Sequence, residues 1–134
     1  MDIDSVPFGN AMGMAVAFSN AIRVPIGADT SLVWVSGQLA FDQDDRLVGV
    51  GDVAAQTEQC IRNITAILAR WGGDLSCVTN VLIFVTSMAG LEEIHRVRRE
   101  MFARPYPAST LVQVTGFVNS DALIEIQAQA VLRD

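Results

Sequence analysis

One segment, residues 52–73, limits the possible folds more than any other, because it has a clear beginning, period and end. Asp52 is a good N-cap, since its carboxylate can accept hydrogen bonds from the unpaired amides of a first helical turn. Apolar side chains then recur at steps of three and four residues: Cys60, Ile61, Ile64, Ile67, Leu68 and Trp71. Gly72 and Gly73 can end the helix, because glycine readily adopts the left-handed C-cap conformation. The segment predicts an amphipathic helix with one buried face.

Segments typical of β-strands lie on both sides of this helix. Residues 31–41 are rich in β-branched and aromatic side chains, and residues 77–85 are so apolar that we expect a strand buried on both faces. Residues 16–24 predict a shorter strand. Residues 46–50 predict a hairpin partner for 31–41, joined to it by the polar turn 42–45.

A second, shorter helix is predicted over residues 90–102, and two strands, 109–118 and 122–132, close the chain. Pro105 and Pro107 cannot continue the helix, because proline lacks a backbone donor and restrains the residue before it. The last strand alternates between apolar residues and the polar residues Glu125, Gln127 and Gln129.

The predicted order is β-β-β-α-β-α-β-β, in one domain that covers residues 1–134 and begins with an irregular arm at 1–13. The fold class is therefore α+β, a mixed sheet of about six strands with two helices packed on one face. The other face must find a partner, and self-association is the simplest way to cover it.

The composition excludes several classes of protein. The chain of 134 residues is 51% hydrophobic and carries a net charge of −6, so phosphate backbones and anionic lipids repel it and we expect neither nucleic acid nor membrane as a partner. The N-terminus lacks the pattern of a signal peptide, and we expect a cytoplasmic protein. We expect Cys60 and Cys77 to be reduced and, like Trp34 and Trp71, to serve packing. With His95 as the sole histidine, no zinc site can be built from Cys and His.

Five motifs occur in an order that resembles a known family. They are Phe18-Ser19-Asn20-Ala21, Val35-Ser36-Gly37-Gln38, Val50-Gly51-Asp52 with Gln59 and Asn63, Pro107-Ala108-Ser109-Thr110, and Ile124-Glu125-Ile126-Gln127-Ala128. They extend from about Phe18 to Leu132. The chain resembles the Rid family of reactive intermediate deaminases, also called YjgF or, in older usage, L-PSP endoribonucleases.

The resemblance implies a chorismate-mutase-like fold, a homotrimer with three clefts between subunits, and no cofactor. In active members an arginine in a Pro-Ala-Arg motif holds the carboxylate of a 2-imino acid, and a glutamate on the last strand positions the water that releases ammonia. Glu125 matches that glutamate, and Ser36 and Gly37 match the backbone that lines the cleft.

The chain departs from this pattern at two positions. Phe18 stands where many members have tyrosine, so it keeps a ring that could stack on a substrate but loses the hydroxyl. Ser109 stands where the arginine is expected, and a neutral serine would bind a carboxylate roughly 2–4 kcal/mol less tightly. Another arginine could take over that role, and the candidates are Arg104, Arg23, Arg98 and Arg99.

The other candidate residues have two interpretations each. Ser109 and Thr110 either form a polar wall of the cleft or bond to nearby backbone where a strand begins. His95 aligns loosely with a family position whose side chain approaches the ligand, and histidine suits acid–base chemistry, but a lone helix histidine is more often solvated or packed. The basic run 95–99 could contact RNA, although its acidic flanks favour a solvated helix face.

The leading hypothesis is an enzyme that hydrolyses an imine, an enamine or a similarly activated small molecule at subunit clefts, with Glu125 positioning water. The second is a ligand-binding or interaction module that kept the fold and lost the chemistry, which Ser109 favours. An endoribonuclease ranks third. Standard 2-imino acid deamination is in doubt because of Ser109.

Overall fold

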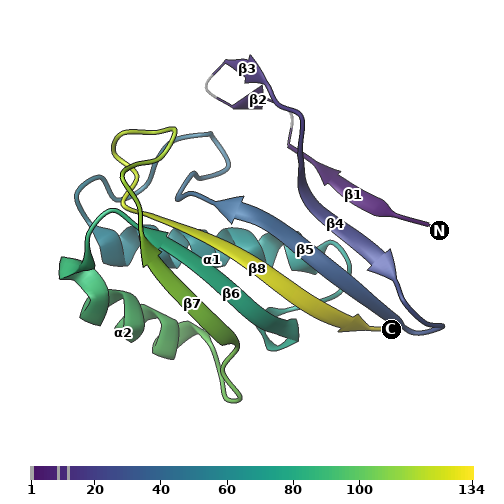
Figure 1. The fold of residues 1–134 in the computed structure, drawn as a ribbon. Helices are drawn as coiled ribbons and strands as arrows, with labels where there is room; N and C mark the ends of the chain where they lie inside the picture. The colour runs from purple at the N-terminus through teal and green to yellow at the C-terminus, as the bar shows by residue number, and fades with distance from the viewer. Residues whose placement is uncertain (1, 9, 12) are drawn as a thin grey trace.

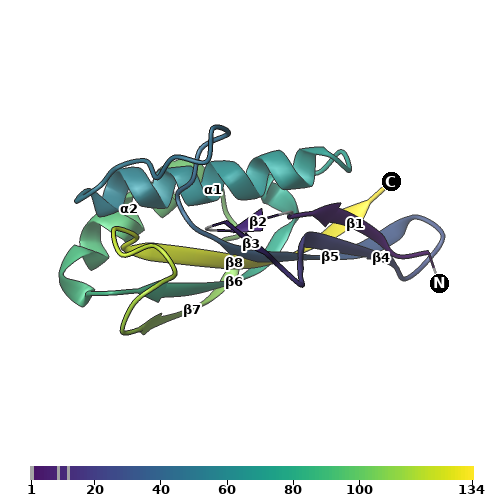
Figure 2. The same cartoon turned by 90° about the horizontal axis from the view of Figure 1, so that it is seen from above.

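The computed structural model describes residues 2–8, 10, 11 and 13–134, and it contains one six-stranded sheet with both α-helices on the same side (Figures 1 and 2). The predicted fold class is confirmed. The elements, in chain order, are β1 Asp4–Pro7, β2 Asn10–Ala11, β3 Met14–Ala15, β4 Ser19–Pro25, β5 Thr30–Gln38, α1 Val53–Ala69, β6 Val78–Val85, α2 Leu91–Met101, β7 Ala108–Gln113 and β8 Ile124–Arg133. Single 3₁₀ turns at Leu75–Cys77 and Met88–Gly90 precede β6 and α2.

The strand order across the sheet is β1-β4-β5-β8-β6-β7. All neighbours are antiparallel except β6 and β7, which run parallel because α2 carries the chain back between them. The last strand, β8, therefore inserts at the centre, and the predicted strands at 109–118 and 122–132 are not neighbours. Backbone pairing on both edges fixes β8 in position, as it does β4, β5 and β6.

Both predicted helices are confirmed. The Asp52 carboxylate accepts a hydrogen bond from the amide of Ala55, and Gly72 has a φ of +77° just past the end of α1. The buried residues of α1 pack on the face of the sheet that the helices cover. They include most of the apolar residues that the sequence predicted for the buried side of this helix. Among the residues that the structure describes, no helix is both long and apolar enough to cross a membrane.

Two predictions for the N-terminal half need correction. Residues 46–50 return antiparallel beside the end of residues 31–41 as predicted, but over a single bridge, from Leu47 to Phe41, and not as a strand. The reason is local: the Asp42 carboxylate accepts from the amides of Asp44 and Arg46 and closes a tight loop. Gly49, with a φ of +69°, then turns the chain toward α1.

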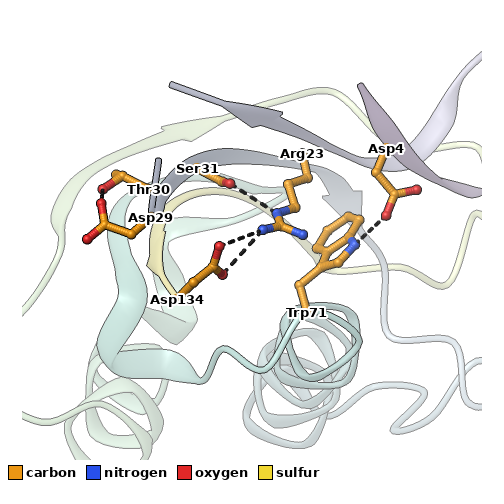
Figure 3. Close-up of polar contacts among 7 residues, drawn as sticks. All are labelled: Asp4, Arg23, Asp29, Thr30, Ser31, Trp71 and Asp134. Carbon is orange, nitrogen blue, oxygen red and sulfur yellow. Dashed lines mark hydrogen bonds and ion pairs between the residues drawn. The ribbon is translucent and has the colours of Figure 1, made fainter. Parts of the chain in front are cut away.

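The arm at 1–13, predicted to be irregular, includes the strand β1, which pairs antiparallel with β4. Met1, Gly9 and Met12 lie outside the described residues. Only Val6 of β1 is buried, so the sequence shows no period there. Side-chain contacts fix this edge instead: the indole N–H of Trp71 donates to Asp4 Oδ2 at 2.8 Å (Figure 3).

The sheet is covered on one face only. The helices cover Val81, Ile83 and Val85 of β6, which are buried. Leu82 and Phe84 between them are half-buried, so the prediction that this strand is buried on both faces is wrong. Trp34, which we expected to serve packing, is 38% exposed on β5. We call the side of the sheet that faces away from α1 and α2 the open face.

Candidate active site

The central strand β8 places Glu125 on the open face. The alternate residues Ile124, Ile126 and Ala128 are buried under the helices, so Glu125 and Gln127 must point the other way. Glu125 lies opposite Phe84 in the pairing of β8 with β6. Its side chain is half-buried, because strands lie on both sides of it.

A bulge in β5 brings Gly37 against this carboxyl group. Val35 pairs with Ala128 and Gln38 with Ile126, so two residues of β5, Ser36 and Gly37, lie opposite a single residue of β8. A Cβ atom at position 37 would lie only 2.7 Å from both Cδ and Oε1 of Glu125. A side chain at position 37 would therefore have to displace the Glu125 carboxyl, and the Gly37 backbone forms one wall around it.

Burial changes the acidity of Glu125. Removal from water disfavours the charged carboxylate and raises the pKa of Glu125 above its ordinary value. None of the hydrogen bonds within the described part of the chain uses this carboxyl. The group therefore keeps its proton to a higher pH than a solvated glutamate, and its oxygens stay available to a ligand or water.

The polar residues beside the bulge are engaged in fixing it. The Ser36 hydroxyl donates to the carbonyl of Ser19 at 2.6 Å. The Gln38 amide donates to Asn20 Oδ1 at 2.8 Å and to the Ser36 carbonyl at 2.9 Å. Ser36 thus supports the bulge with its side chain and leaves only its backbone to a ligand.

The Pro-Ala-Ser-Thr motif is divided between the two faces of the sheet. Thr110 of β7 pairs with Leu82 and shares the open face with Glu125. Ser109 pairs with Val81, which is buried under the helices, so Ser109 is on the helix side at the sheet edge. Both side chains are exposed because β7 is an edge strand.

Two other predicted residues, Phe18 and His95, lie outside the β5 bulge. Phe18 precedes β4 and is 51% exposed, and its ring lies 4.9 Å from the ring of Phe8. His95 is exposed on α2, on the helix side of the sheet. One copy of the chain therefore brings Gly37 and Glu125 together, with Thr110 on the same face, and places Ser109 and His95 on the helix side of the sheet.

Among the candidate arginines, Arg23 is already engaged. Its guanidinium forms an ion pair with Asp134 at 3.3 Å and donates to the Ser31 hydroxyl at 3.1 Å (Figure 3). Arg104 stacks over the ring of Tyr106, 5.1 Å from its centroid. Arg98 is half-buried on α2, and its partial burial lowers the pKa of the guanidinium from its ordinary value.

Arg98 lines a cavity of about 230 Å³ that the sequence did not predict. Its walls are His95, Arg98, Arg99, Phe102, Tyr106 and Pro107. The spacing of the helix residues at i, i+3, i+4 and i+7 could have revealed a shared face, but nothing in the sequence shows that Tyr106 folds back over it.

A larger and more open hollow, about 510 Å³, lies where α1 and α2 begin. Its side chains include Asp52, which caps α1, and Glu93. Two acidic groups would repel an anionic substrate, so we place no substrate there despite its size.

Known proteins resemble this chain in sequence. A family model described as endoribonuclease L-PSP matches residues 8–132. A curated relative, 3-aminoacrylate deaminase RutC from Acinetobacter baylyi, is 42% identical over 107 residues, which cover 80% of this chain and 84% of that protein.

Solved structures show the same fold. A member of the YjgF/YER057c/UK114 family from Mycobacterium tuberculosis superposes with a TM-score of 0.78 at 29% identity, covering 96% of this chain and 98% of the other. RidA from an Antarctic Psychrobacter species gives a TM-score of 0.74 at 28% identity, with coverages of 97% and 94%. The chain therefore belongs to the family described as endoribonuclease L-PSP, whose members are also called YjgF or Rid proteins.

Proposed function

We propose that this protein is a deaminase that hydrolyses the C–N bond of a small enamine or imine, with Glu125 moving the proton and positioning water. The observation that carries the proposal is the state of the Glu125 carboxyl: it is half-buried, it adjoins Gly37, and burial raises its pKa. An acid tuned in this way can donate a proton and then recover it, as general acid–base catalysis requires.

The chemistry needs only one such group. The carboxyl protonates the β-carbon of an enamine, which converts C=C–NH₂ into an iminium ion. An imine substrate gives the same kind of iminium ion when its nitrogen is protonated. Water then adds to the iminium carbon while the carboxylate accepts one of its protons. The carbinolamine transfers its hydroxyl proton to nitrogen and expels ammonia, leaving a carbonyl. One water is consumed, one ammonia is released, and Glu125 ends protonated as it began.

The relatives support this reaction class. The Acinetobacter baylyi relative is named for 3-aminoacrylate, a three-carbon enamine that carries a carboxylate. A deaminase-like role is supported at the level of the family, and we propose a small enamine or imine acid as the substrate class of this chain.

We further propose that the site is completed by association into a homotrimer, with each cleft between two copies. Unpaired apolar surface on the open face supports this, since Trp34 is 38% and Val112 is 40% exposed there. A small ligand that touches Glu125 cannot also reach Ser109 or His95 of the same copy, because the sheet lies between them. A second copy would supply the missing wall.

The test is ammonia release from freshly generated 3-aminoacrylate and 2-iminobutanoate, measured above the spontaneous rate. We expect Glu125→Gln to lower kcat by about 10²–10⁴-fold, because the amide cannot transfer a proton. Glu92→Gln is the matched control, since it removes an exposed carboxylate from the first turn of α2 and should keep wild-type activity. Wild-type turnover by Glu125→Gln would refute the mechanism.

A ligand-binding module is the second candidate, and the neutral Ser109 favours it. For a module we expect binding of small acids with no ammonia release above the spontaneous rate for any substrate tested. Detectable turnover by the wild-type protein that is lost in Glu125→Gln decides for the enzyme.

A further inference from the structure

One face of α2 is covered by the core and the other presents cationic and aromatic side chains. Ile94 and Val97 are buried against the sheet. The residues His95, Arg98, Arg99 and Phe102 lie at i, i+3, i+4 and i+7, so they share one side of the helix. The helix therefore displays a row of basic groups that ends at an aromatic ring.

The loop after α2 turns this row into a cavity. Tyr106 and Pro107 form the opposite wall, and the half-open space of about 230 Å³ has room for a small organic acid. Phe102 is 8% exposed and supplies an apolar floor, whereas Tyr106 is 44% exposed at the mouth. The surface of the cavity is mainly apolar, and the basic side chains His95, Arg98 and Arg99 stand in its wall.

The two arginines of this cavity form no ion pair, whereas three arginines elsewhere in the chain do. Arg96, on the same helix, pairs with Glu100, Arg62 pairs with Glu58, and Arg23 pairs with Asp134. Neither Arg98 nor Arg99 forms an ion pair with any residue that the structure describes. Six of the nine arginines form no ion pair within the described chain, and among these six only Arg98 is half-buried rather than exposed, so its guanidinium lacks both full hydration and a charged partner.

Chemistry identifies the ligand class. A half-buried guanidinium has lost part of its hydration and gains most from an anion with two acceptor oxygens, which it can bind with two parallel hydrogen bonds. A carboxylate provides this arrangement, and a short carbon chain attached to it would contact Phe102 and Tyr106.

We propose that the cavity between α2 and the loop before β7 is a carboxylate-binding subsite, in which Arg98 binds the acid group of the substrate with help from Arg99 and His95. Arg98 would then bind the carboxylate in place of the arginine that is expected at position 109. Ser109 stands at that position, two residues beyond Pro107 at the edge of the cavity. The role in catalysis rests on the proposed deaminase function, whereas the binding of a carboxylate does not.

The position of the subsite sets a geometric condition. The cavity is on the helix side of the sheet, and Glu125 is on the open face. The two can act on one small molecule only if Arg98 of one copy meets Glu125 of another. At substrate concentrations too low to saturate Arg98→Gln, mixing Arg98→Gln with Glu125→Gln subunits should therefore raise the activity above that of either variant alone, because a few mixed clefts would carry both intact residues.

Binding is tested first, with propanoate and its amide propanamide, a pair that differs in charge at nearly equal size. We expect propanoate to shift the NMR signals of residues 95–107 and to bind at least tenfold more tightly than propanamide. Arg98→Gln should weaken propanoate binding at least tenfold, and Arg98→Lys should restore part of it. Arg96→Gln is the matched control, with the same loss of charge on the same helix at an exposed ion pair. Equal binding of the two probes, or equal effects of Arg98→Gln and Arg96→Gln, would overturn the subsite.

Kinetics then separate the subsite from the deaminase proposal. With 3-aminoacrylate we expect Arg98→Gln to raise KM at least tenfold and to change kcat less. If propanoate binds through Arg98 but no substrate is deaminated, the subsite stands and the proposed function fails. If deamination proceeds with an unchanged KM in Arg98→Gln, the subsite fails and the proposed function stands.

Discussion

Substitution of Gly37 by alanine should separate catalysis from stability. The new Cβ atom would lie 2.7 Å from Cδ and Oε1 of Glu125, whereas ordinary contacts begin near 3.4 Å, so the carboxyl must move by about 0.7 Å. A misplacement of about 1 Å can cost roughly 100-fold in rate. We therefore expect kcat to fall about 10- to 100-fold in Gly37→Ala.

Stability should change much less, because the atoms displaced are the flexible end of one half-buried side chain. We expect a cost on the order of 1 kcal/mol, measured as the midpoint of urea unfolding. Gly27→Ala is the control, since a methyl group at position 27 would have nothing within 4 Å and the φ of Gly27 is not left-handed. That variant should match the wild type in both activity and stability.

A double substitution makes the test sharper. Aspartate at position 125 is one methylene shorter and should remove most of the collision with a methyl group at position 37. The kinetic effects of Gly37→Ala and Glu125→Asp should therefore not add, in the way expected for residues in contact. Wild-type kcat in Gly37→Ala, or strictly additive effects in the double variant, would refute the assignment of this wall to the active site.

Two further predictions concern titration and thiol reactivity. Burial raises the pKa of Glu125 in the folded state, so the protonated carboxyl contributes to the free energy of unfolding. This contribution is lost as the pH rises from the ordinary glutamate range through the raised pKa. The thermal midpoint of Glu125→Gln should therefore exceed that of the wild type at pH 7 and approach it near pH 4; a constant difference across this range would contradict the assignment. Burial also raises the pKa of the Cys60 thiol strongly, while Cys77 is partly exposed. Ellman's reagent should titrate one thiol in the native protein and two in denaturant, and Cys77→Ala should abolish the native reaction; rapid native labelling of Cys60 would be inconsistent with the packing described.

Local patterns in the sequence determined the helices and the outward direction of Glu125. A cap at Asp52, an apolar stripe and a terminal glycine specify α1 through contacts a few residues apart. The strict alternation of β8 likewise fixes which of its side chains leave the core, so the sequence alone places Glu125 on a sheet surface.

The residues of the candidate site could be predicted only in part from the sequence. The family motif pointed to Gly37 and Glu125, and the structure places them in contact. Arg98 was one of four candidate arginines in the sequence, because the sequence does not show which arginine forms an ion pair with an acidic side chain and which is unpaired. Its half-burial and the wall made by Tyr106 appear only once the loop after α2 has folded back.

Tertiary structure alone decided the order of the strands and the identity of the edges. No local pattern in the sequence predicts that β8 inserts between β5 and β6, or that the polar segment Asp4–Pro7 pairs with β4 at the sheet edge. The physical reason is that strand pairing joins backbone groups that are identical in every residue, so a partner is chosen by the burial and side-chain contacts of the whole sheet. Those contacts exist between residues as distant as Arg23 and Asp134, and they form only when the complete chain has packed.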